Sequence, residues 1–97
     1  MPTYIAMLKW TQQGIKNVKE SPARVDAAKK AFKKDGVTMK ELYMVMGHHD
    51  MMVVIDAPDD AALAKALLSS ASLGNFTSET CRAFTEDEYR HIVKGLG

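Results

Sequence analysis

Hydrophobic side chains gather in four stretches, each of a length suited to a single β-strand: 3–11, 37–46, 51–57 and 76–84. The first and third are nearly continuous hydrophobic runs, which is typical of central strands with both faces covered. The second and fourth carry several charged and hydroxyl side chains, which is typical of edge strands. Because only Gly47–Asp50 separates the second stretch from the third, these two are expected to form a hairpin.

Between the first and second strands the hydrophobic spacing changes to that of a helix. Thr11 can cap a short helical turn, and Ser21-Pro22 restarts the helix with a favourable N-cap and a proline at its first position. Three apolar residues at helical spacing form the buried stripe: Val25, Ala28 and Phe32. Asp35-Gly36 is a stop signal, so the helix is expected to end there.

Two more helices are predicted, one on each side of the fourth strand. Pro58-Asp59-Asp60 opens the first with acids near its positive end, and Gly74-Asn75 ends it. Its buried stripe is expected at Ala64, Leu67, Leu68 and Ala71. Thr85 and Glu88 have the spacing of a capping box, which begins the terminal helix. That helix carries four apolar side chains at helical spacing: Tyr89, Ile92, Val93 and Leu96.

The order of elements is therefore β-α-β-β-α-β followed by a terminal helix. Right-handed crossovers then give an antiparallel sheet of order 4-1-3-2, which is the ferredoxin-like sandwich of the α+β class. With 97 residues and neither a linker nor an internal repeat, the chain is expected to be one domain spanning residues 1–97.

Both faces of the two central strands are apolar. Ile5 and Met7 alternate with the apolar residues of the opposite face in the first strand, and Met52 and Val54 do so in the third. In a two-layer sandwich the helices cover one sheet face, so the other needs a different cover. The terminal helix could cover part of it, whereas a second subunit would cover all of it. Sheet-to-sheet dimerisation, and hence a homo-oligomer, is the expectation.

Composition and charge narrow the class of protein. The longest apolar run, 51–55, is far shorter than the ~20 residues of a membrane helix, and the first residues lack the pattern of a signal peptide. A single cysteine, Cys81, excludes an internal disulfide and a cysteine-rich zinc site, so a reducing cytoplasmic location is expected. The net charge of +1 predicts no general attraction to nucleic acid or membranes.

The charges are unevenly distributed along the chain. Residues 1–40 hold nine Lys or Arg against three acidic residues, and the remainder holds four against nine. A run of this kind usually forms the solvated face of a helix, and the alternative is a surface that docks a partner.

The segment Gly47–Asp50 carries the clearest candidate chemistry. Asp50 could orient His49 and select its tautomer in the wall of a ligand pocket. Adjacent strand residues face opposite sides, so His48 and His49 are not expected to share one metal ion within a subunit, although each is a candidate ligand. Methionines at 44, 46, 51 and 52 would add soft ligands suited to copper, or simply fill the core. In the structural alternative, Gly47 supplies the turn and Asp50 caps backbone amides.

A second candidate group consists of Trp10, Thr11 and Arg24. Amides at the helix start near Thr11, with Arg24 close by, could hold a carboxylate or phosphate. In the structural alternative Thr11 is only a cap and Trp10 only a core anchor.

Several short segments, taken in order, resemble the GYD domain family over nearly the whole chain. They are Lys9–Ile15, Ser21–Arg24, Gly47–Asp50, Ala57–Asp60, Gly74-Asn75, Glu79-Thr80 and Ala83-Phe84. The resemblance implies a dimeric ferredoxin-like α+β barrel, a fold shared with haem-degrading and small monooxygenases and with the ligand-sensing domains of leucine-responsive regulators. The motif that names the family has tyrosine where this chain has His49, while its glycine and aspartate stand at Gly47 and Asp50.

Three functional hypotheses follow. The first is a small-ligand binding or sensing module with a pocket near the Gly47–Asp50 hairpin. The second is a small monooxygenase-like enzyme, cofactor-free or haem-dependent, with His49 as base or ligand. The third is a structural oligomer without a ligand. A fold shared by proteins of unrelated activity does not choose among them.

Overall fold

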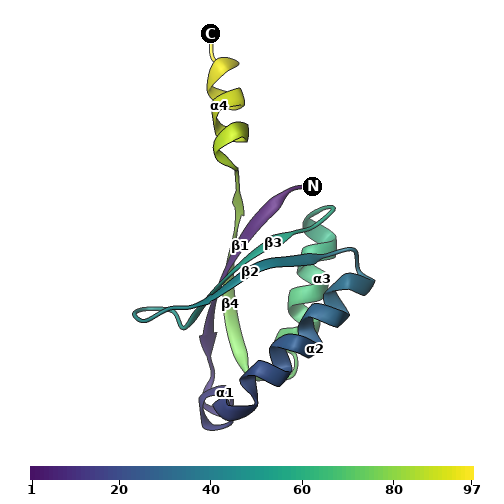
Figure 1. The fold of residues 1–97 in the computed structure, drawn as a ribbon, viewed down its shortest axis with the longest axis vertical. Coiled ribbons are helices and arrows are strands. Elements are labelled where there is room, and N and C mark those ends of the chain that lie inside the picture. The colour runs from purple at the N-terminus through teal and green to yellow at the C-terminus, as the bar shows by residue number, and fades with distance from the viewer.

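The structure is a computed structural model that describes all of residues 1–97 (Figure 1). Its elements follow the predicted order: β1 (Thr3–Trp10), α1 (Gln12–Lys16), the 3-10 turn η1 (Val18–Glu20), α2 (Ser21–Lys34), β2 (Thr38–Met44), β3 (Met51–Asp56), α3 (Asp60–Ala71), β4 (Phe76–Ala83) and α4 (Glu86–Lys94). None of the helices combines the length and the apolar character needed to cross a bilayer.

The four strands form one antiparallel sheet of order β2-β3-β1-β4, which confirms the predicted arrangement. Helices α2 and α3 lie together over one face of this sheet, the inner face (Figure 1). The strand register decides which side chains share a face. Ile5 stands opposite Val54 on β3 and Cys81 on β4, so these three residues belong to the outer face, away from the helices.

The core lies between the inner face and the two helices. Along β1, Tyr4, Ala6 and Leu8 are buried while the residues between them are only partly covered, and β3 shows the same alternation. The hydroxyl of Tyr4 donates a hydrogen bond to the Asp60 carboxylate at the start of α3, and this bond raises the pKa of the Tyr4 phenol. The polar end of this core side chain is therefore satisfied.

The buried stripe of α3 differs from the prediction. Leu63 and Ala66 are the buried residues of this helix, whereas Ala64 is exposed and Leu68 is 70% exposed. The side chain of Asp59 accepts from the Ala62 N–H and caps the helix. The helix is rotated so that the stripe runs one residue earlier than expected.

The outer face of the sheet is formed by apolar side chains of the central strands. Ile5, Met7, Met52 and Val54 point to this side and are half-buried among their neighbours. Neither α2 nor α3 lies over them (Figure 1). The predicted two-sided apolar character of the sheet is therefore present in the structure, with one side covered.

Helix α4 does not fold over the outer face, so the alternative in which the terminal helix covers part of that face is not the arrangement seen here. It continues beyond the end of β4 and stands away from the rest of the chain (Figure 1). All residues from Tyr89 to Gly97 are exposed. The Cα radius of gyration is 14.6 Å, compared with about 12.5 Å expected for a compact chain of this length. The difference is consistent with a projecting arm.

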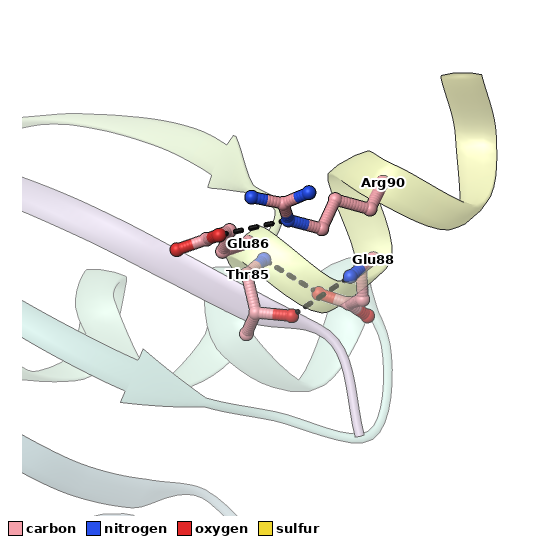
Figure 2. Close-up of polar contacts among 4 residues, drawn as sticks. All are labelled: Thr85, Glu86, Glu88 and Arg90. Atoms are coloured by element: carbon pink, nitrogen blue, oxygen red, sulfur yellow. Dashed lines mark hydrogen bonds and ion pairs between the residues drawn. The ribbon is translucent and has the colours of Figure 1, made fainter. Parts of the chain in front are cut away.

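Local contacts within α4 hold its first turn together (Figure 2). The Thr85 hydroxyl accepts from the Glu88 N–H at 3.2 Å, and the Glu88 carboxylate accepts from the Thr85 N–H at 2.8 Å. Nε of Arg90 forms an ion pair with Oε2 of Glu86 at 2.8 Å. The predicted capping box is therefore confirmed, and it satisfies amides that a helix start leaves without partners.

The capping box makes the start of α4 sensitive to acid. The hydrogen bond from the Thr85 N–H favours the ionised form of Glu88 and holds its pKa below the ordinary 4.5. A depressed pKa contributes stability that is present above the ordinary value and lost as pH falls through the depressed one. The amide proton shift of Thr85, followed by NMR from pH 6 to 2, should titrate with a midpoint below 4.5. Glu88→Gln should abolish this titration, and a midpoint above 4.5 would contradict the assignment.

Candidate functional site

A cavity of about 230 Å³ lies between the inner face of the sheet and helices α2 and α3. Its wall is mainly apolar, with 16 hydrophobic residues among 21. The large side chains in it include Leu8, Trp10, Phe32, Ile55 and Phe76. A concave apolar space with few polar groups is the usual form of a small-ligand site.

Arg24 is the charged residue in this wall. It lies in the first turn of α2, which begins at Ser21 with Pro22 next to it. Its Nη1 donates to the carbonyl oxygen of Asn17 at 3.0 Å, while Nη2 is buried and has no hydrogen-bond partner. A guanidinium group stays charged in a protein, so a buried N–H without an acceptor is costly. An anionic oxygen in the cavity would satisfy it.

The hydroxyl and the N–H of Thr11 are both used in hydrogen bonds at one end of the cavity. Its hydroxyl donates to the Gly74 carbonyl at 2.6 Å and accepts from the Gly14 N–H at 3.0 Å. Its own N–H donates to the Asn75 carbonyl at 3.1 Å. The amide of Thr11 is therefore not free for an anion, and its contacts hold Asn75 in the cavity wall.

Close packing at Gly14 reinforces this junction. A Cβ atom added to Gly14 would lie 1.9 Å from the carbonyl oxygen of Asn75, where no side chain fits. The first turn of α1 and the loop before β4 thus approach each other through their backbones.

Asp50 joins the β2–β3 hairpin to the end of β1. Its Oδ2 accepts from the Trp10 N–H at 2.9 Å, and its own N–H donates to the Leu8 carbonyl at 2.8 Å. Its carbonyl accepts from the Val45 N–H at 2.9 Å. Asp50 does not line the cavity, but it fixes the backbone of Trp10, which does.

The histidines lie apart from the cavity. Nε2 of His49 is 3.5 Å from a carboxylate oxygen of Glu79, on the outer side of the sheet, and its ring meets that of His48 edge-on with centroids 5.0 Å apart. The expectation that Asp50 orients His49 was therefore wrong, because strand pairing directs the Asp50 carboxylate to Trp10 and places Glu79 beside His49.

The soft donors around the hairpin do not converge on one position that a copper ion could occupy. No three His, Cys, Asp or Glu side chains converge anywhere in the structure. Met51 is buried in the core, Met46 is 92% exposed, and neither histidine reaches the apolar cavity. The candidate soft ligands thus point in different directions.

The cavity wall also contains polar residues that sequence reasoning did not propose for a site. They are Ser21 at the start of α2, Ser69 and Ser70 on α3, and Asn75 in the loop after α3. Ser70 continues the stripe of Leu63, Ala66 and Leu67 at helical spacing, so a serine on the inner side of a helix was the available signal.

Replacing Asp50 tests its structural contacts. Asp50→Ala should lower the free energy of unfolding by about 1–3 kcal/mol, because the Trp10 N–H loses its acceptor. Asp50→Asn retains an acceptor oxygen and should cost about 1 kcal/mol or less. Urea unfolding of the two variants provides the measurement. Equal losses in both would mean that the charge, not the acceptor, matters.

Several solved structures share this fold. A feast or famine regulatory protein from Mycobacterium tuberculosis, solved with L-methionine, superposes with a TM-score of 0.66 at 12% identity. The match covers 88% of this chain and 51% of that one, so this chain spans about half of its length. A protein from Thermus thermophilus matches with a TM-score of 0.56 at 22% identity, over 88% of this chain and 95% of that one. These likenesses establish the ferredoxin-like fold.

Sequence similarity is higher to a curated relative from Thermus thermophilus, named glutamine synthetase and cystathionine beta-lyase binding protein. The two sequences are 32% identical over 84 residues, which cover 86% of this chain and 88% of the relative. Two of these similar proteins are thus named for regulation or for binding. Residues 4–93 match the GYD domain, and the chain therefore belongs to the GYD domain family.

Proposed function

We propose that this protein is a cytoplasmic small-ligand-binding module whose ligand carries an anionic group and occupies the cavity between the sheet and α2 and α3. The observation that carries the proposal is the buried Nη2 of Arg24, which has no hydrogen-bond partner, on a residue that is the one charged member of a mainly apolar cavity wall. A carboxylate would accept from it in a charge-assisted hydrogen bond.

The size and lining of the cavity limit the ligand. A volume of about 230 Å³ corresponds to seven or eight water molecules at roughly 30 Å³ each, which suits a small carboxylic or amino acid. The apolar walls favour a short hydrophobic tail on the ligand. L-methionine, bound by one of the structural neighbours, combines these two features.

Binding measurements with matched ligands test the proposal. By calorimetry, hexanoate and L-methionine should bind, and hexanamide should bind more weakly than hexanoate because it lacks the charge. Arg24→Met keeps a long apolar side chain and removes the donor, so it should weaken hexanoate binding by about 10–100-fold.

The matched control is Arg82→Met. Arg82 lies on β4 and does not line the cavity. Its guanidinium carbon Cζ is 4.4 Å from the ring centroid of Phe84. This variant should bind hexanoate like the unmodified protein. Equal binding of hexanoate and hexanamide, or an Arg24→Met variant with unchanged affinity, would overturn the role of Arg24.

A second candidate function is binding of a metabolic enzyme, which the name of the Thermus thermophilus relative favours. The exposed lysines of α2 at positions 29, 30, 33 and 34 supply a charged surface for such a contact. If this surface is used, purified glutamine synthetase or cystathionine beta-lyase should bind the protein with an association rate that falls with salt. Lys30→Glu with Lys34→Glu should slow association, whereas Lys9→Glu on β1 should not.

A further inference from the structure

The exposed side of α4 is a stripe of large apolar side chains. The arm stripe consists of Tyr89, Ile92, Val93 and Leu96, which are 58%, 49%, 47% and 71% exposed. Tyr89, Ile92 and Val93 fall on one side of the helix and Leu96 follows just beyond its end, whereas the polar residues Asp87, His91 and Lys94 fall on the other side. A helix with one apolar side normally packs that side against a surface.

The link to β4 keeps the arm stripe away from the chain's own sheet. Only Phe84 and Thr85 separate β4 from α4. Thr85 has an extended backbone, with φ −63° and ψ 166°, and its capping box with Glu88 fixes the direction in which the helix starts. Folding the arm back over the outer face would require this two-residue link to leave its extended course and turn.

The chain exposes more surface than a compact monomer of its mass, and the excess is as large as a protein–protein interface. The accessible surface is 6734 Å², whereas a compact monomer of 10.7 kDa should expose about 5,500 Å². The excess of about 1,200 Å² exceeds the roughly 800 Å² that each partner buries in a standard protein interface. The arm stripe and the outer sheet face are both available to be buried.

We infer that α4 is an exchanged arm: the arm stripe of one copy packs on the outer sheet face of a second copy, and the contact is reciprocal. One chain carries both uncovered surfaces, an apolar helix and an apolar sheet face, so two identical chains can cover all four surfaces through a two-fold contact. On the sheet, Ile5, Met7, Met52 and Val54 would receive the arm. This goes beyond ligand binding, since the cavity opens on the other side of the sheet.

Sedimentation of point variants tests the arm. The unmodified chain should sediment as a dimer at micromolar concentration, because both apolar surfaces are then covered. Ile92→Glu buries a charge in the proposed contact and should raise the dissociation constant by at least about 30-fold. Lys94→Glu on the opposite side of α4 is the matched control and should leave the dimer unchanged. Since α4 is exposed from Tyr89 onward, neither change should disturb the fold of its own chain.

Cross-linking locates the surface that the arm covers. Cys81 is the single cysteine and lies on the outer face, opposite Ile5. A short bismaleimide should join the thiol of an Ile92→Cys, Cys81→Ser chain to Cys81 of an unmodified chain, and mass spectrometry identifies the joined peptides. Lys94→Cys in the same background should cross-link several-fold less.

Three results would overturn the inference. A monomeric unmodified chain would leave the arm without a partner. An Ile92→Glu variant that dimerises normally would show that the sheets pack without the arm. Equal cross-linking from positions 92 and 94 would place the arm elsewhere than on the outer face.

Discussion

The pairing of β1 with β3 is the contact on which the rest of the structure depends. Each strand presents apolar side chains in both directions, and their register places like faces together over six residue pairs. The inner side, with Ala6 and Val53, forms the floor of the core and of the cavity. The outer side, with Met7 and Met52, cannot also be covered by α2 and α3, because these helices lie together on one face. The same strand pair therefore produces a closed side and an open side.

Much of the fold could be predicted from the sequence because its strongest signals are local. The continuous apolar runs identified the central strands, and the Thr85 capping box located the start of α4. Which side of α3 is buried was harder to predict, because Leu67 and Leu68 are adjacent and fit either of two overlapping apolar stripes. The direction of α4 was not accessible, because the backbone angles of two linking residues decide it and a hydrophobic pattern carries no information about them.

The candidate site shows the same division between local and long-range information. Trp10 and Arg24 were grouped with Thr11 because of their place around the predicted helix start, and the structure has both Trp10 and Arg24 in one cavity wall. The contacts of Asp50 depend instead on a residue 40 positions earlier, whose N–H the strand pairing brings to its carboxylate. His49 was the obvious neighbour by sequence, yet the connection between β2 and β3 places it beside Glu79 instead.

Gly14 has a consequence for how related sequences can be interpreted. The space beside it is filled by the Asn75 carbonyl, so even a methyl group would force α1 and the loop before β4 apart. Position 14 therefore acts as a diagnostic character: a relative with alanine or a larger residue there must join its first helix to the loop before its last strand in another way. Sequences that differ at this position should be aligned and classified separately, before any cavity residue is transferred between them.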